Sequence, residues 1–94
     1  MYRIIDDRGT GKTSRLMLIA KENNAVFVCS NPDAMKYKAK AYGIDGINFM
    51  SYNDFIHYYD PSIHEYVVDE LEMFMKYVIG SGPKLIGYTL SKND

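Results

Sequence analysis

The sequence predicts an α/β fold in three layers, a sheet of about five mostly parallel strands with helices on both faces. Short apolar runs alternate with longer amphipathic segments, which is the pattern of a parallel sheet covered by helices. Several of these runs are apolar at consecutive positions, as expected for strands that are buried on both sides. Because 94 residues make one small domain and no change in composition marks a boundary, we expect a single domain over residues 1–94.

Five apolar runs mark the expected strands. They cover Tyr2 to Ile5, Ala25 to Cys29, Ile47 to Met50, Tyr66 to Val68, and Lys84 to Leu90. The cluster Gly80-Ser81-Gly82-Pro83 precedes the last of these runs. It is typical of a turn rather than of a domain linker, because only one short strand follows it.

Four helices are expected between the strands, and capping residues fix several of their ends. Asn31 is a capping asparagine with a proline after it, and Ser51 is a second side chain that can cap a helix. Asp54, three residues after Ser51, favours the positive end of a helix dipole. The helices run from about Lys12 to Asn23, from Asn31-Pro32 to Gly43, from Ser51 onwards, and from Glu70 to Ile79 with a stop at Gly80.

Charge and composition exclude some classes of protein. A net charge of −1 gives no global reason to expect nucleic acid or an anionic membrane as a partner. The single cysteine, Cys29, lies in an apolar run and has no internal disulfide partner, so we expect a buried thiol in a reducing compartment. The sequence has neither a leader pattern nor an apolar run long enough to span a membrane. We therefore expect a cytoplasmic protein with no membrane partner.

A glycine-containing loop connects the first expected strand to the first expected helix. Its residues are Asp7-Arg8-Gly9-Thr10-Gly11-Lys12-Thr13, and they match the phosphate-binding signature G-x-x-x-x-G-K-[ST] except that Asp6 replaces the first glycine. In that signature the backbone N–H groups cradle phosphates, the lysine reaches the outer phosphates and the hydroxyl holds Mg²⁺. The helix that follows directs its N-terminal dipole at the phosphates. Lys12 and Thr13 are therefore candidate ligands for phosphate and for Mg²⁺.

Two acidic residues follow the later apolar run Tyr66-Val67-Val68. In the template for phosphoryl transfer, the first acid, Asp69, holds Mg²⁺, and the second, Glu70, orients or deprotonates the attacking water. The structural alternative is that Asp69 is the N-cap of the next helix and Glu70 an acid in its first turn. The glycine loop upstream favours the functional interpretation.

The two motifs together resemble the P-loop NTPases of the additional-strand, catalytic-glutamate class, and the resemblance covers essentially the whole chain. Gly9 to Thr13 matches the Walker A motif of that class, and Val67 to Glu70 matches its Walker B motif. The order of elements is most similar to the first RecA-like domain of superfamily 1 helicases and to short phage P-loop proteins. Ile47 to Phe55 falls where such domains have a strand leading into an aromatic helix, and Leu85 to Ser91 falls where they have a sensor strand.

The resemblance implies a minimal RecA-like domain that binds ATP, or another purine nucleoside triphosphate, with Mg²⁺. It also implies that the last strand inserts between the loop strand and the Walker B strand. The strand Tyr2 to Ile5 is then an open edge, available to a protein partner or to a second copy of the chain. The implied roles are nucleotide binding by Arg8, Gly9, Thr10, Gly11, Lys12, Thr13 and Ser14, Mg²⁺ binding by Thr13 and Asp69, catalysis by Lys12 and Glu70, and a sensor at Thr89 or Ser91. A final core strand that ends in polar residues explains the segment Leu85 to Ser91 equally well.

Three departures from the family argue against a fast, self-sufficient enzyme. The Asp6 carboxylate, at 4 Å from a phosphate, would repel it by about 1 kcal/mol in water and about 4 kcal/mol at an effective dielectric of 20. Arg8 either pairs with this acid or with Asp7, or contacts a phosphate. The only other arginines are Arg3 and Arg15, whereas fast hydrolysis usually uses an arginine finger worth roughly 10³–10⁵ in rate. A helicase also needs a second RecA-like domain, which 94 residues cannot hold.

We therefore expect weak or partner-dependent NTP hydrolysis. The alternative is a non-catalytic protein with a P-loop fold, of phage type, that docks on a host ATPase or a defence complex and modulates or inhibits it. Nucleic acid is a third and weakly supported partner, because Lys36 to Tyr42 interleaves lysines with tyrosines. On a helix Lys36 and Lys40 share a face while Lys38 points elsewhere, so a solvated face is favoured.

Overall fold

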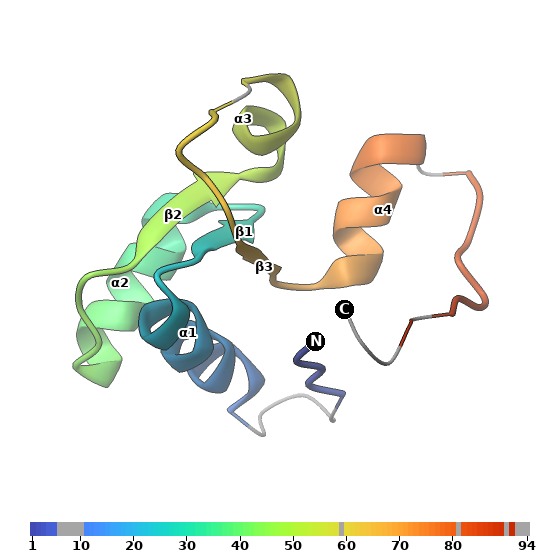
Figure 1. Cartoon of the computed structure of the whole chain (residues 1–94). Helices are drawn as coiled ribbons and strands as arrows, with labels where there is room; N and C mark the ends of the chain where they lie inside the picture. Colours follow the sequence, from blue (N-terminus) through green and yellow to red (C-terminus); the bar gives the residue numbers. More distant parts are fainter. Residues whose placement is uncertain (6–10, 59, 81, 90, 92–94) are drawn as a thin grey trace.

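The computed structural model describes residues 1–5, 11–58, 60–80, 82–89 and 91. Within them the chain forms three strands, and all of them are parallel in the order β2-β1-β3. Figure 1 shows this sheet with four helices around it. The elements are α1 (Lys12–Asn23), β1 (Val26–Cys29), α2 (Pro32–Tyr42), β2 (Asn48–Ser51), α3 (Tyr52–His57), β3 (Tyr66–Val68) and α4 (Leu71–Ile79). The α/β class is confirmed.

The central strand β1 carries the core, because its side chains alternate between two apolar clusters. Phe27 and Cys29 face α1 and α2, where they meet Met17, Ala20 and Ala39. Burying a side chain such as Phe27 completely stabilises the fold by about 1.5–3 kcal/mol. This cluster fixes two helices to one face of the sheet.

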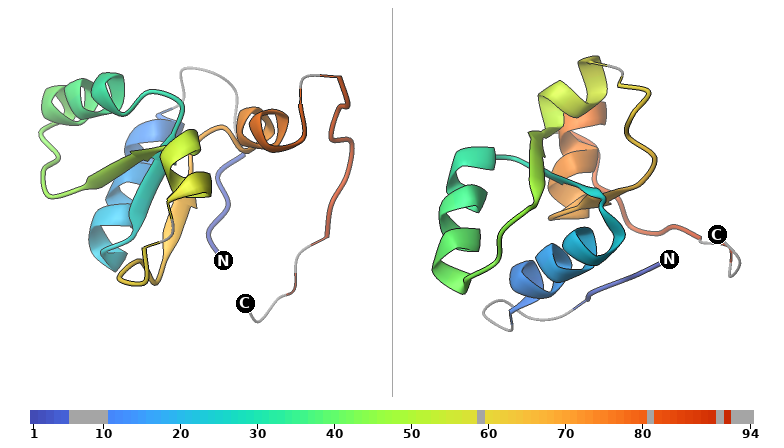
Figure 2. Two further views of the ribbon diagram at one scale, coloured as in Figure 1. Left: turned by 90° about the horizontal axis from the view of Figure 1, so that it is seen from above. Right: turned by 60° about the vertical axis from the view of Figure 1, so that its left-hand side comes forward.

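The other face of β1 is covered mainly by α3. Val26 and Val28 are buried there with Tyr52, and the half-buried Phe55 and Phe74 pack against this cluster. The sheet therefore has α1 and α2 on one face and α3 on the other, whereas α4 lies beyond β3 at the side of the sheet (Figure 2).

Capping residues set the helix ends at the predicted places. The Asn31 side chain accepts a hydrogen bond from the backbone N–H of Ala34 at 3.1 Å, and the Ser51 hydroxyl accepts one from Asp54 at 3.0 Å. At the other end of α2, Gly43 has φ 72°, a left-handed conformation that glycine adopts without strain. These caps confirm the predicted starts of α2 and α3 and the predicted end of α2.

Two of the five predicted strands are wrong. Residues 1–5 and 84–89 form no strand, and the predicted end of the second of these strands, Leu90, lies outside the described residues. Tyr2, Ile5 and Ile86 are 62%, 77% and 92% exposed, so their apolar side chains have no layer to pack on. An apolar run becomes a strand only when a neighbouring edge pairs with its backbone, and β3, the nearest edge, is three residues long. Consequently no last strand inserts beside β3, and Tyr2 to Ile5 is not the edge strand.

Both of these segments nevertheless lie on the β3 side of the sheet, away from β2 (Figures 1 and 2). The outer edge of β3 has no strand partner within the described part of the chain. Two stretches of extended chain therefore lie near an open sheet edge.

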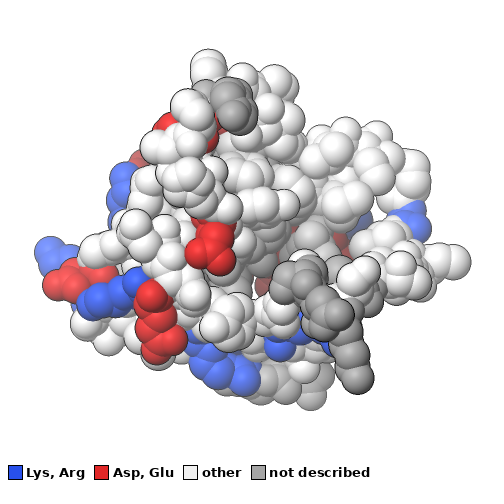
Figure 3. Space-filling view, in the orientation of Figure 1, with Lys and Arg blue, Asp and Glu red and all other residues white. Residues whose placement is uncertain are grey.

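Charged side chains are unevenly distributed over the face shown in Figure 3. They gather over α1 and α2, whereas the surface around α4 is largely uncharged. The exposed apolar residues of α4 are Leu71, Met73, Tyr77, Val78 and Ile79. Across the described ranges, no helix combines the length and apolarity that a membrane crossing needs.

Candidate functional site

The start of α1 and the end of β3 meet at the carboxyl edge of the sheet. The backbone N–H of Asp69 donates a hydrogen bond to the carbonyl of Val28 at 2.9 Å, which holds Asp69 directly beyond β3 and beside β1. The side chain of Thr13 lies close enough to the Asp69 carboxyl to lower its pKa by hydrogen bonding. Two residues that the sequence predicts to share one Mg²⁺ site therefore lie close together.

The turn into α1 needs a glycine. Gly11 is the N-cap and has φ 79°, in the left-handed region where a β-carbon causes strain. Its carbonyl oxygen accepts the backbone N–H of Arg15 at 3.1 Å and the hydroxyl of Ser14 at 3.0 Å. Lys12 and Thr13, the first two residues of the helix, are both half-buried and follow directly from this turn.

The electrostatics of Asp69 reflect opposing influences. Burial is the largest of them and raises the pKa of the carboxyl, and the neighbouring charge of Glu70 raises it further. The charges of Lys38 and Lys12 and the hydrogen bond from Thr13 act in the opposite direction. Asp69 is thus a half-buried acid near two cations, a setting in which a bound divalent cation would favour the ionised form.

Glu70 links β3 to α4 and is exposed. It is the N-cap of α4, with φ 58° and ψ 70°, and its carbonyl accepts the first helical hydrogen bond from Phe74. Its side chain makes no capping hydrogen bond among the described residues. Asp69 lies one position before the N-cap, and Glu70 occupies the N-cap position without a side-chain capping bond, so neither acid has the place that the structural alternative gave it.

Several predicted site residues are not brought into this arrangement. Arg8, Gly9 and Thr10, together with Asp6 and Asp7, lie outside the described residues. Thr89 and Ser91 are exposed and belong to no strand within the described segments, so their sensor role stays a prediction.

Two residues near Asp69 were missed by sequence reasoning. Tyr52 is 5% exposed, and its hydroxyl donates a hydrogen bond to the Asp69 carbonyl at 2.6 Å. Lys38 was expected on a solvated face; it is exposed, and its charge nevertheless acts on Asp69. The sequence did offer a signal for Lys38. It lies three residues after Met35 and one before Ala39, so it falls beside the buried face of α2.

Cys29, at the end of β1, is the buried thiol that the sequence predicts. It is 1% exposed, and its Sγ donates to the Met50 carbonyl at 3.6 Å. Burial, followed by the charge of Asp69, raises the pKa of Cys29 to about 11. The thiol is therefore part of the core.

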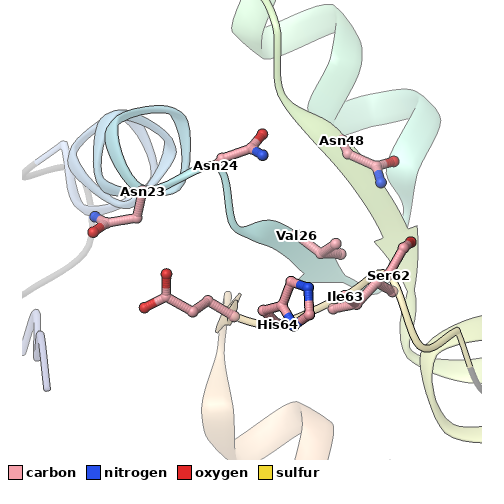
Figure 4. A pocket seen from close by; sticks show the side chains of 8 residues that line it. Asn23, Asn24, Val26, Asn48, Ser62, Ile63 and His64 are labelled. Carbon is pink, nitrogen blue, oxygen red and sulfur yellow. The ribbon is translucent and has the colours of Figure 1, made fainter.

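A cavity lies at the opposite end of the strands, between the end of α1 and the beginnings of β1 and β2 (Figure 4). It has a volume of about 310 Å³ and a mostly polar lining. It includes neither Thr13 nor Asp69, so it is separate from the candidate site. The described residues also contain no group of three or more His, Cys, Asp or Glu side chains that could hold a metal by themselves.

Comparisons with protein-family models, with curated proteins and with solved structures find no match to this chain. The case for a function therefore depends on the residues and on their geometry.

Proposed function

We propose that this chain binds ATP, or a closely related purine nucleoside triphosphate, together with Mg²⁺. The observation that carries the proposal is the placement of Thr13, in the first turn of α1, close to Asp69 at the carboxyl edge of a parallel sheet. Ligands bind at this edge in open α/β folds. A hydroxyl and a carboxylate are oxygen ligands of the kind that Mg²⁺ prefers.

The residues around this pair suit a triphosphate. Lys12 is positioned to bind the outer phosphates, and the first-turn N–H groups of α1, with its dipole, favour an anion. Lys38 adds a second positive charge from α2. When Mg²⁺ is bound it would offset the charge of the phosphates, while Thr13 and Asp69 hold it in place.

Hydrolysis in this proposal is weak, or it depends on a partner. Glu70 is exposed next to Asp69, where its carboxylate can accept a proton from a water molecule. Residues 16–94 contain no arginine, so a finger from beyond α1 and its loop would have to come from outside these 94 residues. The P-loop, RecA-like form of the fold and a cytoplasmic location belong to the same proposal. The parallel order of the three strands and the glycine turn that leads into Lys12 at the start of α1 support that form of the fold.

Calorimetric titration of Mg-ATP into the wild-type chain and into Lys12→Ala tests the proposal. The expected result is binding to the wild type that Lys12→Ala abolishes and that Lys40→Ala, the matched lysine control near the end of α2, leaves unchanged. Absence of heat at millimolar Mg-ATP would refute the proposal. Turnover by the wild type and by Glu70→Gln then separates binding from hydrolysis.

A second candidate is the non-catalytic interaction protein. The observation that favours it is the uncharged surface around α4, where Tyr77, Val78 and Ile79 are 45%, 52% and 60% exposed. Such a protein would keep the fold without needing the nucleotide. Normal partner binding by Lys12→Ala would favour this candidate.

A further inference from the structure

Tyr52 links the ends of the two outer strands of the sheet, β2 and β3. It is the first residue of α3 and directly follows β2, whereas Asp69 follows β3 on the far side of β1. Neighbouring strands are roughly 4.8 Å apart, so the link spans about two strand spacings. The Tyr52 hydroxyl donates to the Asp69 carbonyl at 2.6 Å and lies 3.4 Å from the Glu70 carbonyl.

Packing holds the Tyr52 ring in this position. The ring is buried on Val26 and Val28 and makes an edge-to-face contact with Phe74, with 5.2 Å between the centroids. The Ser51 cap fixes the start of α3 and hence the backbone of Tyr52. A tyrosine hydroxyl, whose ordinary pKa is about 10, is protonated at neutral pH, so it can donate to the Asp69 carbonyl.

The hydrogen bond completes the anchoring of Asp69. Its backbone N–H donates to the Val28 carbonyl and its own carbonyl accepts from the Tyr52 hydroxyl, while the Thr13 side chain lies near its carboxyl. That carbonyl belongs to the peptide that joins Asp69 to Glu70. Glu70 has a left-handed conformation that non-glycine residues rarely adopt, so this peptide needs external support.

We infer that Tyr52 is a positioning residue of the nucleotide site, where its hydroxyl fixes the peptide between Asp69 and Glu70 and thereby the places of both carboxylates. The inference rests on the proposed function and deepens it. Tyr52 acts through Asp69 and Glu70.

Tyr52→Phe tests this role because it removes the hydroxyl and keeps the ring. Tyr77→Phe is the matched control, since the Tyr77 hydroxyl bonds to Asn53 in the same aromatic cluster and not to Asp69. In the free chain, exchange of the Asp69 amide, whose N–H donates to Val28, should accelerate about fivefold in Tyr52→Phe and remain unchanged in Tyr77→Phe. Thermal unfolding of both variants confirms that they are folded.

The second measurement is the dissociation constant for ATP, with Mg²⁺ and with EDTA. Tyr52→Phe should weaken Mg-ATP binding about fivefold and leave metal-free ATP binding unchanged, because only the metal uses Asp69. A purely structural role would weaken both forms of binding together.

The outcomes separate the two proposals. If the wild type binds no Mg-ATP, the proposed function fails and the positioning role fails with it. If the wild type binds and Tyr52→Phe binds equally well, or if exchange of the Asp69 amide does not change, the positioning role alone is overturned. A fivefold loss that depends on Mg²⁺ supports both.

Discussion

The side chain of Thr13, the second residue of α1, lies close enough to Asp69, the residue that follows β3, to lower the pKa of its carboxyl. The two lie far apart in the sequence, and the parallel sheet brings them together because α1 packs on β1 while β3 pairs with β1. Their proximity joins the two halves of the candidate site. It also suggests the first substitution to make.

Thr13→Ala should weaken the Mg²⁺-dependent part of ATP binding by about 10- to 100-fold, the range typical of lost metal-site partners. Thr13→Ser keeps the hydroxyl and should retain most of the affinity. Titrating Mg²⁺ into the chain at fixed ATP measures the effect. Equal Mg²⁺ dependence in Thr13→Ala and the wild type would contradict the assignment of Thr13 to the metal.

Asp69→Asn should stabilise the free chain at neutral pH. Because burial and Glu70 raise the pKa of Asp69 in the folded chain, the folded state binds the proton more tightly than the unfolded state does. Wild-type stability therefore falls as pH rises from the ordinary pKa of an aspartate through the raised one, and it does not recover above that. Urea unfolding across this window should show the fall in the wild type and its reduction in Asp69→Asn. A less stable Asp69→Asn chain at pH 7 would contradict the prediction.

Lys38→Ala should raise the pKa of Asp69 further, because the charge of Lys38 lowers it in the wild type. The same variant should bind Mg-ATP more weakly, since it removes a cation near the phosphates. The Asp69 carboxyl can be followed by ¹³C NMR during a pH titration, with Lys40→Ala as the control on the same helix. An identical Asp69 titration in the two variants would show that Lys38 does not reach the site.

Cys29 should react slowly with iodoacetamide at pH 8. Burial raises its pKa to about 11, so only about one thiol in a thousand is ionised at that pH. The unfolded chain in urea should react at the rate of an ordinary cysteine. Fast labelling of the folded chain would indicate that the core around β1 opens readily.

The helices were predictable because their signals are local. Asn31, Ser51 and Gly43 mark helix ends through bonds or conformations within a few residues of themselves. The four consecutive buried residues of β1 likewise predict a central strand. Both kinds of signal require no knowledge of what lies across the sheet.

The errors arose where structure depends on a distant partner. Tyr2 to Ile5 and Lys84 to Leu90 have strand-like apolar patterns, yet the described residues of neither segment pair with an edge. Tyr52 was missed as part of the site because its hydrogen bond to Asp69 crosses two strands, and no sequence spacing encodes such a link. The proximity of Thr13 and Asp69 was predictable only through the combined spacing of two motifs.

Helix α4 lies at the margin of the core. Its position affects how long the candidate site stays folded between local unfolding events. None of its nine residues is fully buried, and only Phe74 and Met75 are half-buried. A segment held by so few contacts detaches in local unfolding events that leave α1 and β1 intact. Each such event frees the carbonyl of Glu70 from its bond to Phe74, so the turn that presents the two acids dissolves with the helix. The lifetime of the assembled site is therefore set by the least stable cooperative unit of the domain, and a ligand or partner that clamps α4 would lengthen it.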